Sequence, residues 1–77
     1  PEVERLKNLV ITILHVRDER LSIHDFCMVQ GQGHENLIFD VLIPLDLKGE
    51  EKNIKKSIET LIKLMYHNKK TFWSNYV

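Results

Sequence analysis

A glycine-containing break at residues 31–33 separates two strand-like runs near the middle of the chain. The first run extends from Leu21 to Gln30 and the second from Asn36 to Pro44, and both contain Ile, Phe or Val residues that suit a pleated surface. Two such runs on either side of a short Gly-x-Gly segment predict a hairpin. This hairpin restricts the fold more than any other feature, because it decides which side chains share a face of the sheet.

Apolar residues at helical spacing flank the hairpin on both sides. They predict one helix from Glu2 to Leu14 and a second from Ile54 to Met65. The segment from Thr71 to Val77 is rich in aromatic and β-branched residues and predicts a third strand. The order α-β-β-α-β predicts an α+β, ferredoxin-like two-layer sandwich, in which an antiparallel hairpin and a third strand pack on two helices.

The chain has 77 residues, which allow one domain of modest stability. Small domains often gain stability by dimerisation, because a dimer buries further apolar surface. Eleven basic and eleven acidic residues give no net charge, which argues against a nucleic-acid partner. A single cysteine, Cys27, excludes an internal disulfide and fits a reduced, cytosolic setting.

No apolar run approaches the length of about 20 residues needed to cross a bilayer. Pro1 leads directly into the first helical pattern. We therefore expect residues 1–77 to be a single domain cut from a longer protein, and removal of an initiator methionine is the alternative.

Folding the hairpin about Gln32 assigns its side chains to two faces, because strand side chains alternate. The odd-numbered residues form a nearly continuous apolar face, which we expect to receive the two helices. They are Leu21, Ile23, Asp25, Cys27, Val29, Leu37, Phe39, Val41 and Ile43. Asp25 is the exception on this face, and we expect it to lie at an edge and to pair with Arg17 or Arg20.

The even-numbered face mixes large apolar side chains with one imidazole and one carboxylate. Its expected pairs are Ser22 with Leu42, His24 with Asp40, Phe26 with Ile38, and Met28 with Asn36. Directly opposed residues place their Cβ atoms about 4.5–5.5 Å apart, within reach of a shared hydrogen bond or a shared metal ion. We expect this mixed face to serve association. A shift of one residue would remove the pairing.

His34 lies in the hairpin loop, close in sequence to the same face. His24, His34 and Asp40 therefore form a candidate metal site with two nitrogen donors and one oxygen donor. Imidazole and carboxylate suit Zn²⁺, and also Mn²⁺, Fe²⁺ or Co²⁺. The alternative is structural: a His–Asp pair on a sheet forms a hydrogen bond, and a loop histidine is a polar surface residue. Cys27 is interpreted as a small buried apolar residue.

The segment from Ile23 to Phe26, the glycine-containing turn and the segment from Leu37 to Val41 together resemble the cytosolic C-terminal domain of cation diffusion facilitators. These membrane transporters export Zn²⁺, Mn²⁺, Fe²⁺ or related ions. The stretch from Gly33 to Asp40 is similar to bacterial members of the family. The resemblance implies a metallochaperone-like fold, a homodimer, a position at the cytoplasmic face of the cell membrane, and a transmembrane domain in the same polypeptide.

The resemblance also implies residue roles. His24 falls on the histidine of the family's His-Asp motif, and Asp40 falls where many members carry a second-strand histidine ligand. The sequence departs from the family at Asn53, where some members have a further histidine, and at residues 74–77, which lack the usual terminal His or Asp ligands. With His34 added from the loop, the expected ligand set holds a divalent cation, with Zn²⁺ favoured, near the dimer interface.

Two functions are compatible with the sequence. The first is a cytosolic regulatory and dimerisation domain of a divalent-cation efflux transporter. The second is a metal-independent, ferredoxin-like module that dimerises or binds a small molecule, with Phe26, Ile38 and Leu42 as its interface. An enzyme is not expected, because His24 has no candidate nucleophile beside it and no phosphate-binding glycine loop precedes a helix.

Overall fold

The computed structural model describes the backbone of residues 2–76 and the side chains of residues 2–73. Its elements are α1 (Glu2–Arg17), β1 (Ser22–Gln30), β2 (Glu35–Leu42), the 3-10 helix η1 (Leu45–Glu50), α2 (Glu51–Met65) and β3 (Lys69–Tyr76). The predicted order α-β-β-α-β is confirmed. Val77, at the end of the predicted third strand, lies outside the described residues, as does Pro1.

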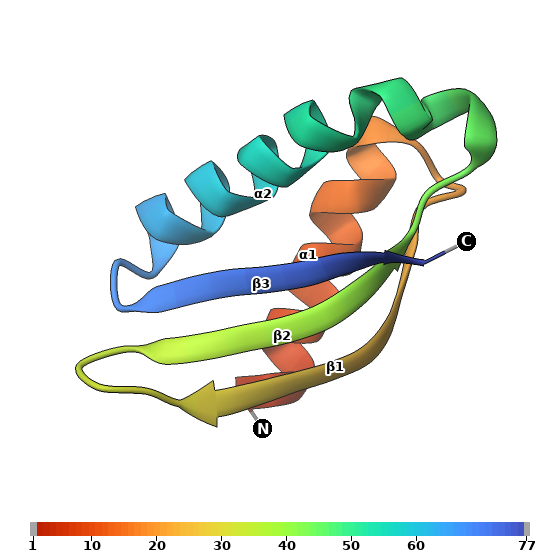
Figure 1. Ribbon diagram of the computed structural model, residues 1–77. Coiled ribbons are helices and arrows are strands. Elements are labelled where there is room, and N and C mark those ends of the chain that lie inside the picture. The colour runs from red at the N-terminus through yellow and green to blue at the C-terminus, as the bar shows by residue number, and fades with distance from the viewer. Residues whose placement is uncertain (1, 77) are drawn as a thin grey trace.

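The molecule is an α+β, ferredoxin-like two-layer sandwich, in which α1 and α2 cover one face of a three-stranded sheet (Figure 1). The strand order is β1-β2-β3, so that β2 lies at the centre. β1 pairs with β2 in the antiparallel direction, whereas β3 pairs with β2 in the parallel direction. A parallel pair needs a long crossover connection, and α2 supplies it. Within residues 2–76, no helix has the length and hydropathy required to cross a membrane.

The core lies between the helices and the sheet. Each helix contributes buried residues at four-residue spacing, and β2 contributes alternate residues, as the two periodicities require. These residues are Leu6, Val10 and Leu14 of α1, Ile54, Ile58 and Ile62 of α2, and Leu37, Phe39 and Val41 of β2. Both helices are longer than predicted, because solvated charged residues extend them beyond their apolar stripes.

The hairpin register agrees with the prediction at the end of β1 that is remote from the turn, where Ser22 pairs with Leu42 and His24 with Asp40. A β-bulge follows, in which two residues of β1, Asp25 and Phe26, oppose the single residue Phe39. Asp25 has a φ angle of 54°. Aspartate is one of the few non-glycine residues that adopt this left-handed conformation readily.

The bulge reverses the faces predicted for the second half of β1. Phe26 and Met28 pack against the core, and the ring of Phe26 stacks on that of Phe39 with centroids 5.5 Å apart. Cys27 is exposed and Val29 is 46% exposed. The predicted helix-facing positions of Cys27 and Val29 were therefore wrong, as were the outward positions of Phe26 and Met28. One inserted residue shifts the alternation of every residue that follows it.

The partners expected for Asp25 were also wrong. Asp25 is exposed, whereas Arg17 pairs with Glu50 at 2.6 Å and Arg20 pairs with Asp46 at 2.9 Å. The hydrogen bond from Arg20 lowers the pKa of the Asp46 carboxyl. These ion pairs connect the end of α1 and the turn after it to η1, so they belong to the scaffold.

Candidate functional site

We call the side of the sheet opposite the helices the open face. Its described side chains are Ser22, His24, Cys27, Val29, Asn36, Ile38, Asp40, Leu42, Lys70 and Phe72. A row of apolar side chains crosses its centre, because Ile38 of β2 pairs with Cys27 on one side and with Phe72 on the other. Ile38 is 40% exposed and Phe72 is 51% exposed.

His24 and Asp40 are direct partners across β1 and β2, as predicted. Their neighbours Ile23 and Phe39 contact the core, so both polar side chains point to the open face. His24 is exposed and Asp40 is half-buried. The strand pair thus brings one imidazole and one carboxylate within reach of a common hydrogen bond or a common metal ion.

The bulge lies immediately after His24 and explains the surroundings of the pair. It turns Phe26 into the core and leaves the smaller Cys27 on the open face beside the row of apolar side chains. Bulges that re-aim side chains occur often beside functional sites. In β3, the residue in register with Asp40 is Ser74.

The structure does not bring His34 to the His24–Asp40 pair. His34 lies in the turn, where its main-chain oxygen accepts a hydrogen bond from the Gly31 N–H at 2.8 Å and its Nδ1 lies 2.9 Å from the oxygen of Gln32. Six residues of extended chain separate His34 from Asp40, which is about 20 Å. Among the residues that the structure describes, no group of three or more His, Cys, Asp or Glu side chains is placed to hold a metal ion.

The position of His34 depends on Gly31. A Cβ atom at residue 31 would lie 2.9 Å from Nε2 of His34, so the imidazole packs against the glycine backbone. Asn53, at the position where the family resemblance places a further histidine, lies on α2 and is exposed. It therefore belongs to the helix layer, whereas the His24–Asp40 pair lies on the other side of the sheet.

The sequence prediction missed Cys27 and Val29 as members of the open face. The sequence feature that could have indicated their position is Asp25, the aspartate in an otherwise apolar series of odd-numbered residues. A residue that tolerates the left-handed conformation at such a position indicates a bulge as readily as an edge.

No protein-family model matches the chain, and no curated protein matches it. A solved structure of CzrB, described as the zinc form of a proposed zinc transporter, is similar to it with a TM-score of 0.83 and 17% sequence identity. The similarity covers 97% of this chain and 83% of that chain. The two chains share a fold. This agreement extends over α1, the hairpin, α2 and β3, and it supports the α+β assignment made from the sequence.

Proposed function

We propose that this chain is the cytosolic regulatory and dimerisation domain of a divalent-cation efflux transporter of the cation diffusion facilitator family. The observation that carries the proposal is the direct opposition of His24 and Asp40 on the open face. These two residues are the ones to which the family resemblance gives ligand roles. The shared fold with the zinc form of CzrB supports the same assignment.

The donor chemistry of the pair suits zinc. Zn²⁺ takes four ligands in tetrahedral geometry, and imidazole nitrogen and carboxylate oxygen are both common among them. One chain offers two such donors at this position, His24 and Asp40. A second copy related by a two-fold axis would present the same pair and complete a site of four ligands. The proposed ligand set is therefore narrower than the one predicted from the sequence, because His34 is distant.

The row of apolar side chains beside the pair supports homodimerisation through the open face. Ile38, Val29 and Phe72 are each between 40% and 51% exposed. Removing apolar surface from water contributes about 25 cal/mol for each Å². Small domains of this length gain most from such burial, because their own cores are limited. The metal and the apolar row would then act on the same interface.

In this mechanism, cation binding stabilises one relative arrangement of the two copies. The cation can shift the equilibrium between the two arrangements only to the extent that it binds one of them more tightly than the other. The transmembrane domain of the same polypeptide would sense that change. Imidazole and carboxylate groups must both be deprotonated to hold a cation, so binding at such a site releases protons and is weaker in acid.

Calorimetric titration of the domain with Zn²⁺ and Mn²⁺ tests the ligand assignment. We expect His24→Ala and Asp40→Asn each to weaken zinc binding by at least about tenfold, since each removes a ligand. His34→Ala is the matched control and should bind as the parent does. Equal zinc affinity of the parent and His24→Ala would exclude the proposed site. If His34→Ala lost as much zinc affinity as His24→Ala, the ligand set of His24, His34 and Asp40 predicted from the sequence would be correct.

A metal-independent dimer is the second candidate, and the exposed apolar row favours it, because Ile38 and Phe72 need no cation to associate. Sedimentation velocity with added zinc and with a chelator distinguishes the two functions. A dimer that strengthens with zinc in the parent, but not in His24→Ala, supports the transporter domain. A dimer that is indifferent to the chelator supports the metal-independent module.

A further inference from the structure

The outer edge of β3 offers unpaired backbone groups. β3 has β2 as its sheet neighbour on one side, and within residues 2–76 no strand lies on the other. The Glu35 N–H donates to the oxygen of Asn68 at 2.8 Å. Since alternate residues bond across a parallel pair, this contact directs the backbone groups of Thr71 and Trp73 to the outer edge. Such an edge is a template for a further strand.

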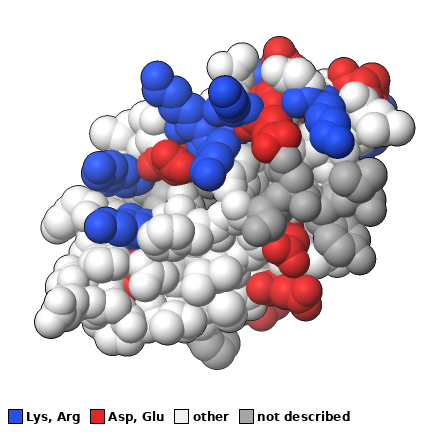
Figure 2. Space-filling model, viewed as in Figure 1, with Lys and Arg blue, Asp and Glu red and all other residues white. Residues whose placement is uncertain are grey.

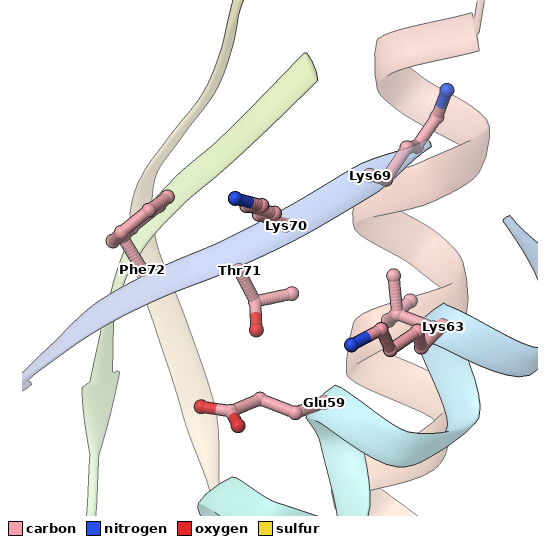
Figure 3. A pocket seen from close by; sticks show the side chains of 7 residues that line it. Glu59, Lys63, Lys69, Lys70, Thr71 and Phe72 are labelled. Carbon is pink, nitrogen blue, oxygen red and sulfur yellow. The ribbon is translucent and has the colours of Figure 1, made fainter. Parts of the chain in front are cut away.

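A pocket lies between this edge and α2. Its volume is about 350 Å³, and Glu59 and Lys63 of α2 line it together with Thr71 of β3. Figure 3 shows Glu59 and Lys63 extending from α2 on one side of the pocket and Thr71 facing them from β3. Ile62 contributes an apolar part of the lining. A strand added along β3 would direct every second side chain into this space.

The segment that contributes most of the pocket lining has an unbalanced charge, and Lys63 and Lys70 are its exposed lysines at the pocket itself. The segment from residue 52 to residue 70 holds six of the eleven basic residues and one of the eleven acidic residues, Glu59. The lysines are Lys52, Lys55, Lys56, Lys63, Lys69 and Lys70. Lys69 is buried and its Nζ contacts Glu35 at 2.6 Å, whereas the other five are exposed. In Figure 2 the blue side chains of Lys and Arg gather over α2 and the beginning of β3.

We propose that the groove between β3 and α2 binds an extended acidic peptide segment of a partner protein as a fourth strand of the sheet. The backbone edge of β3 supplies the hydrogen bonds, and the lysines supply charge complementarity. A second copy of this chain fits the groove less well, because its own β3 contains Lys69 and Lys70 and no acidic residue that could complement the lysines.

The spacing of Glu59 and Lys63 suggests the pattern of the peptide. One helical turn separates these residues, which corresponds to about 6 Å along α2. Two residues of an extended strand span about 6.7 Å, so two inward side chains of the peptide match the pair. The peptide therefore carries an acidic residue opposite Lys63. Two positions away it carries a hydroxyl or basic residue opposite Glu59.

A binding experiment with short, fluorescently labelled peptides tests this proposal on the whole chain in the presence of a chelator. The parent peptide alternates valine with glutamate and has threonine two positions from its central glutamate. A second peptide replaces the glutamates with lysine, and a third carries N-methyl groups on the amides that would face β3. We expect the lysine and N-methyl peptides to bind at least about tenfold more weakly than the parent peptide.

Two charge-reversal variants locate the contact. Lys63→Glu should lower the affinity for the parent peptide by at least about fivefold. Lys52 lies about three turns away on the same helix, so Lys52→Glu should change this affinity by less than about twofold. Thermal unfolding of both variants verifies that they are folded. In nuclear magnetic resonance spectra, the amide signals of Thr71 and Trp73 should shift on binding.

Equal effects of Lys63→Glu and Lys52→Glu would overturn the proposal, as would an N-methylated peptide that binds as tightly as its parent. Binding of polyphosphate, or of vesicles with one-third phosphatidylserine, that is as tight as peptide binding would also overturn it, because a general anion surface would then suffice. The proposal does not depend on the metal site. His24→Ala should bind the peptide as the parent protein does, so the two proposals succeed or fail separately.

Discussion

The two faces of the sheet use similar residues for different purposes. On the helix side, Leu37, Phe39 and Val41 of β2 are at most 1% exposed, and they hold the two layers together. On the open face, Ile38 of the same strand is 40% exposed and Phe72 of β3 is 51% exposed. Adjacent residues such as Ile38 and Phe39 thus differ in burial and not in apolar character. The fold needs the first face, whereas the second is available for binding.

A core substitution should give the largest difference between the two faces. Phe39 is 1% exposed and contacts the rings of Phe26 and Trp73, so Phe39→Ala should lower the free energy of unfolding by about 3–5 kcal/mol. Its sequence neighbour on the open face provides the control, and Ile38→Ala should cost less than about 1 kcal/mol in the monomer. Urea denaturation at a concentration that favours monomers measures both. Similar losses at the two positions would refute the contrast.

The helix side also contains a buried charged residue, so its contribution to stability can be compared with that of an exposed neighbour. The Lys69 side chain is 4% exposed, and its Nζ lies 2.6 Å from Glu35, 3.2 Å from Glu2 and 5.2 Å from the ring centroid of Tyr66. Lys69→Ala leaves Glu35 without this cation, so we expect a loss of about 2–3 kcal/mol in urea denaturation. Lys70→Ala, at the adjacent exposed position, should cost less than about 0.5 kcal/mol.

The pH dependence of this ion pair follows from the direction of its pKa shift. The hydrogen bond with Glu35 raises the pKa of Lys69, although desolvation acts in the opposite direction. A raised folded-state pKa stabilises the native state fully below the unfolded lysine pKa of about 10.4. The contribution is then lost as the pH rises through the folded-state pKa. The difference between parent and Lys69→Ala should therefore be constant near neutral pH and should decrease above about pH 10.4. A difference that decreases near pH 7 would contradict this assignment.

Much of the fold was predictable, because periodicity reports which face of each element is buried. The helical spacing of Ile54, Ile58 and Ile62 and the alternation in β2 both describe the core correctly. The His24–Asp40 pairing was also predicted correctly, although the turn is centred between Gln32 and Gly33 and not at Gln32. The extra residue of the bulge offsets this difference, so the predicted register holds at the end of the strand pair remote from the turn. Alternation was a reliable guide along β2 and in β1 up to His24.

The remainder of the candidate site depended on two features that periodicity does not report. One is the bulge at Asp25 and Phe26, which exchanged the faces of every later residue in β1. The other is the turn, which keeps His34 close to Gly31 and distant from Asp40. Net charge was similarly uninformative, because a total of zero conceals the lysines that the fold collects on α2 and β3.

The bulge itself should respond to substitution more weakly than the core. A β-branched residue is strongly disfavoured in the left-handed region, so Asp25→Val should cost about 1–2 kcal/mol in urea denaturation. Glycine adopts this conformation without strain, so Asp25→Gly should be as stable as the parent or slightly more stable. If Asp25→Val were as stable as Asp25→Gly, the left-handed conformation at this residue would be wrong, and the register of the hairpin with it.

A small effect on monomer stability is expected at Phe72, where the two faces can be compared at the edge of the sheet. The side chain is 51% exposed, so Phe72→Ala should change the free energy of unfolding of the monomer by less than about 1 kcal/mol. The same substitution removes the largest side chain of the apolar row and should weaken self-association by at least about fivefold in sedimentation experiments. Phe26→Ala gives the matched comparison, because Phe26 stacks on Phe39 at the helix side and should affect folding more than association. If Phe72→Ala lowered monomer stability as much as Phe26→Ala, the open face would be part of the fold and not a surface kept for binding.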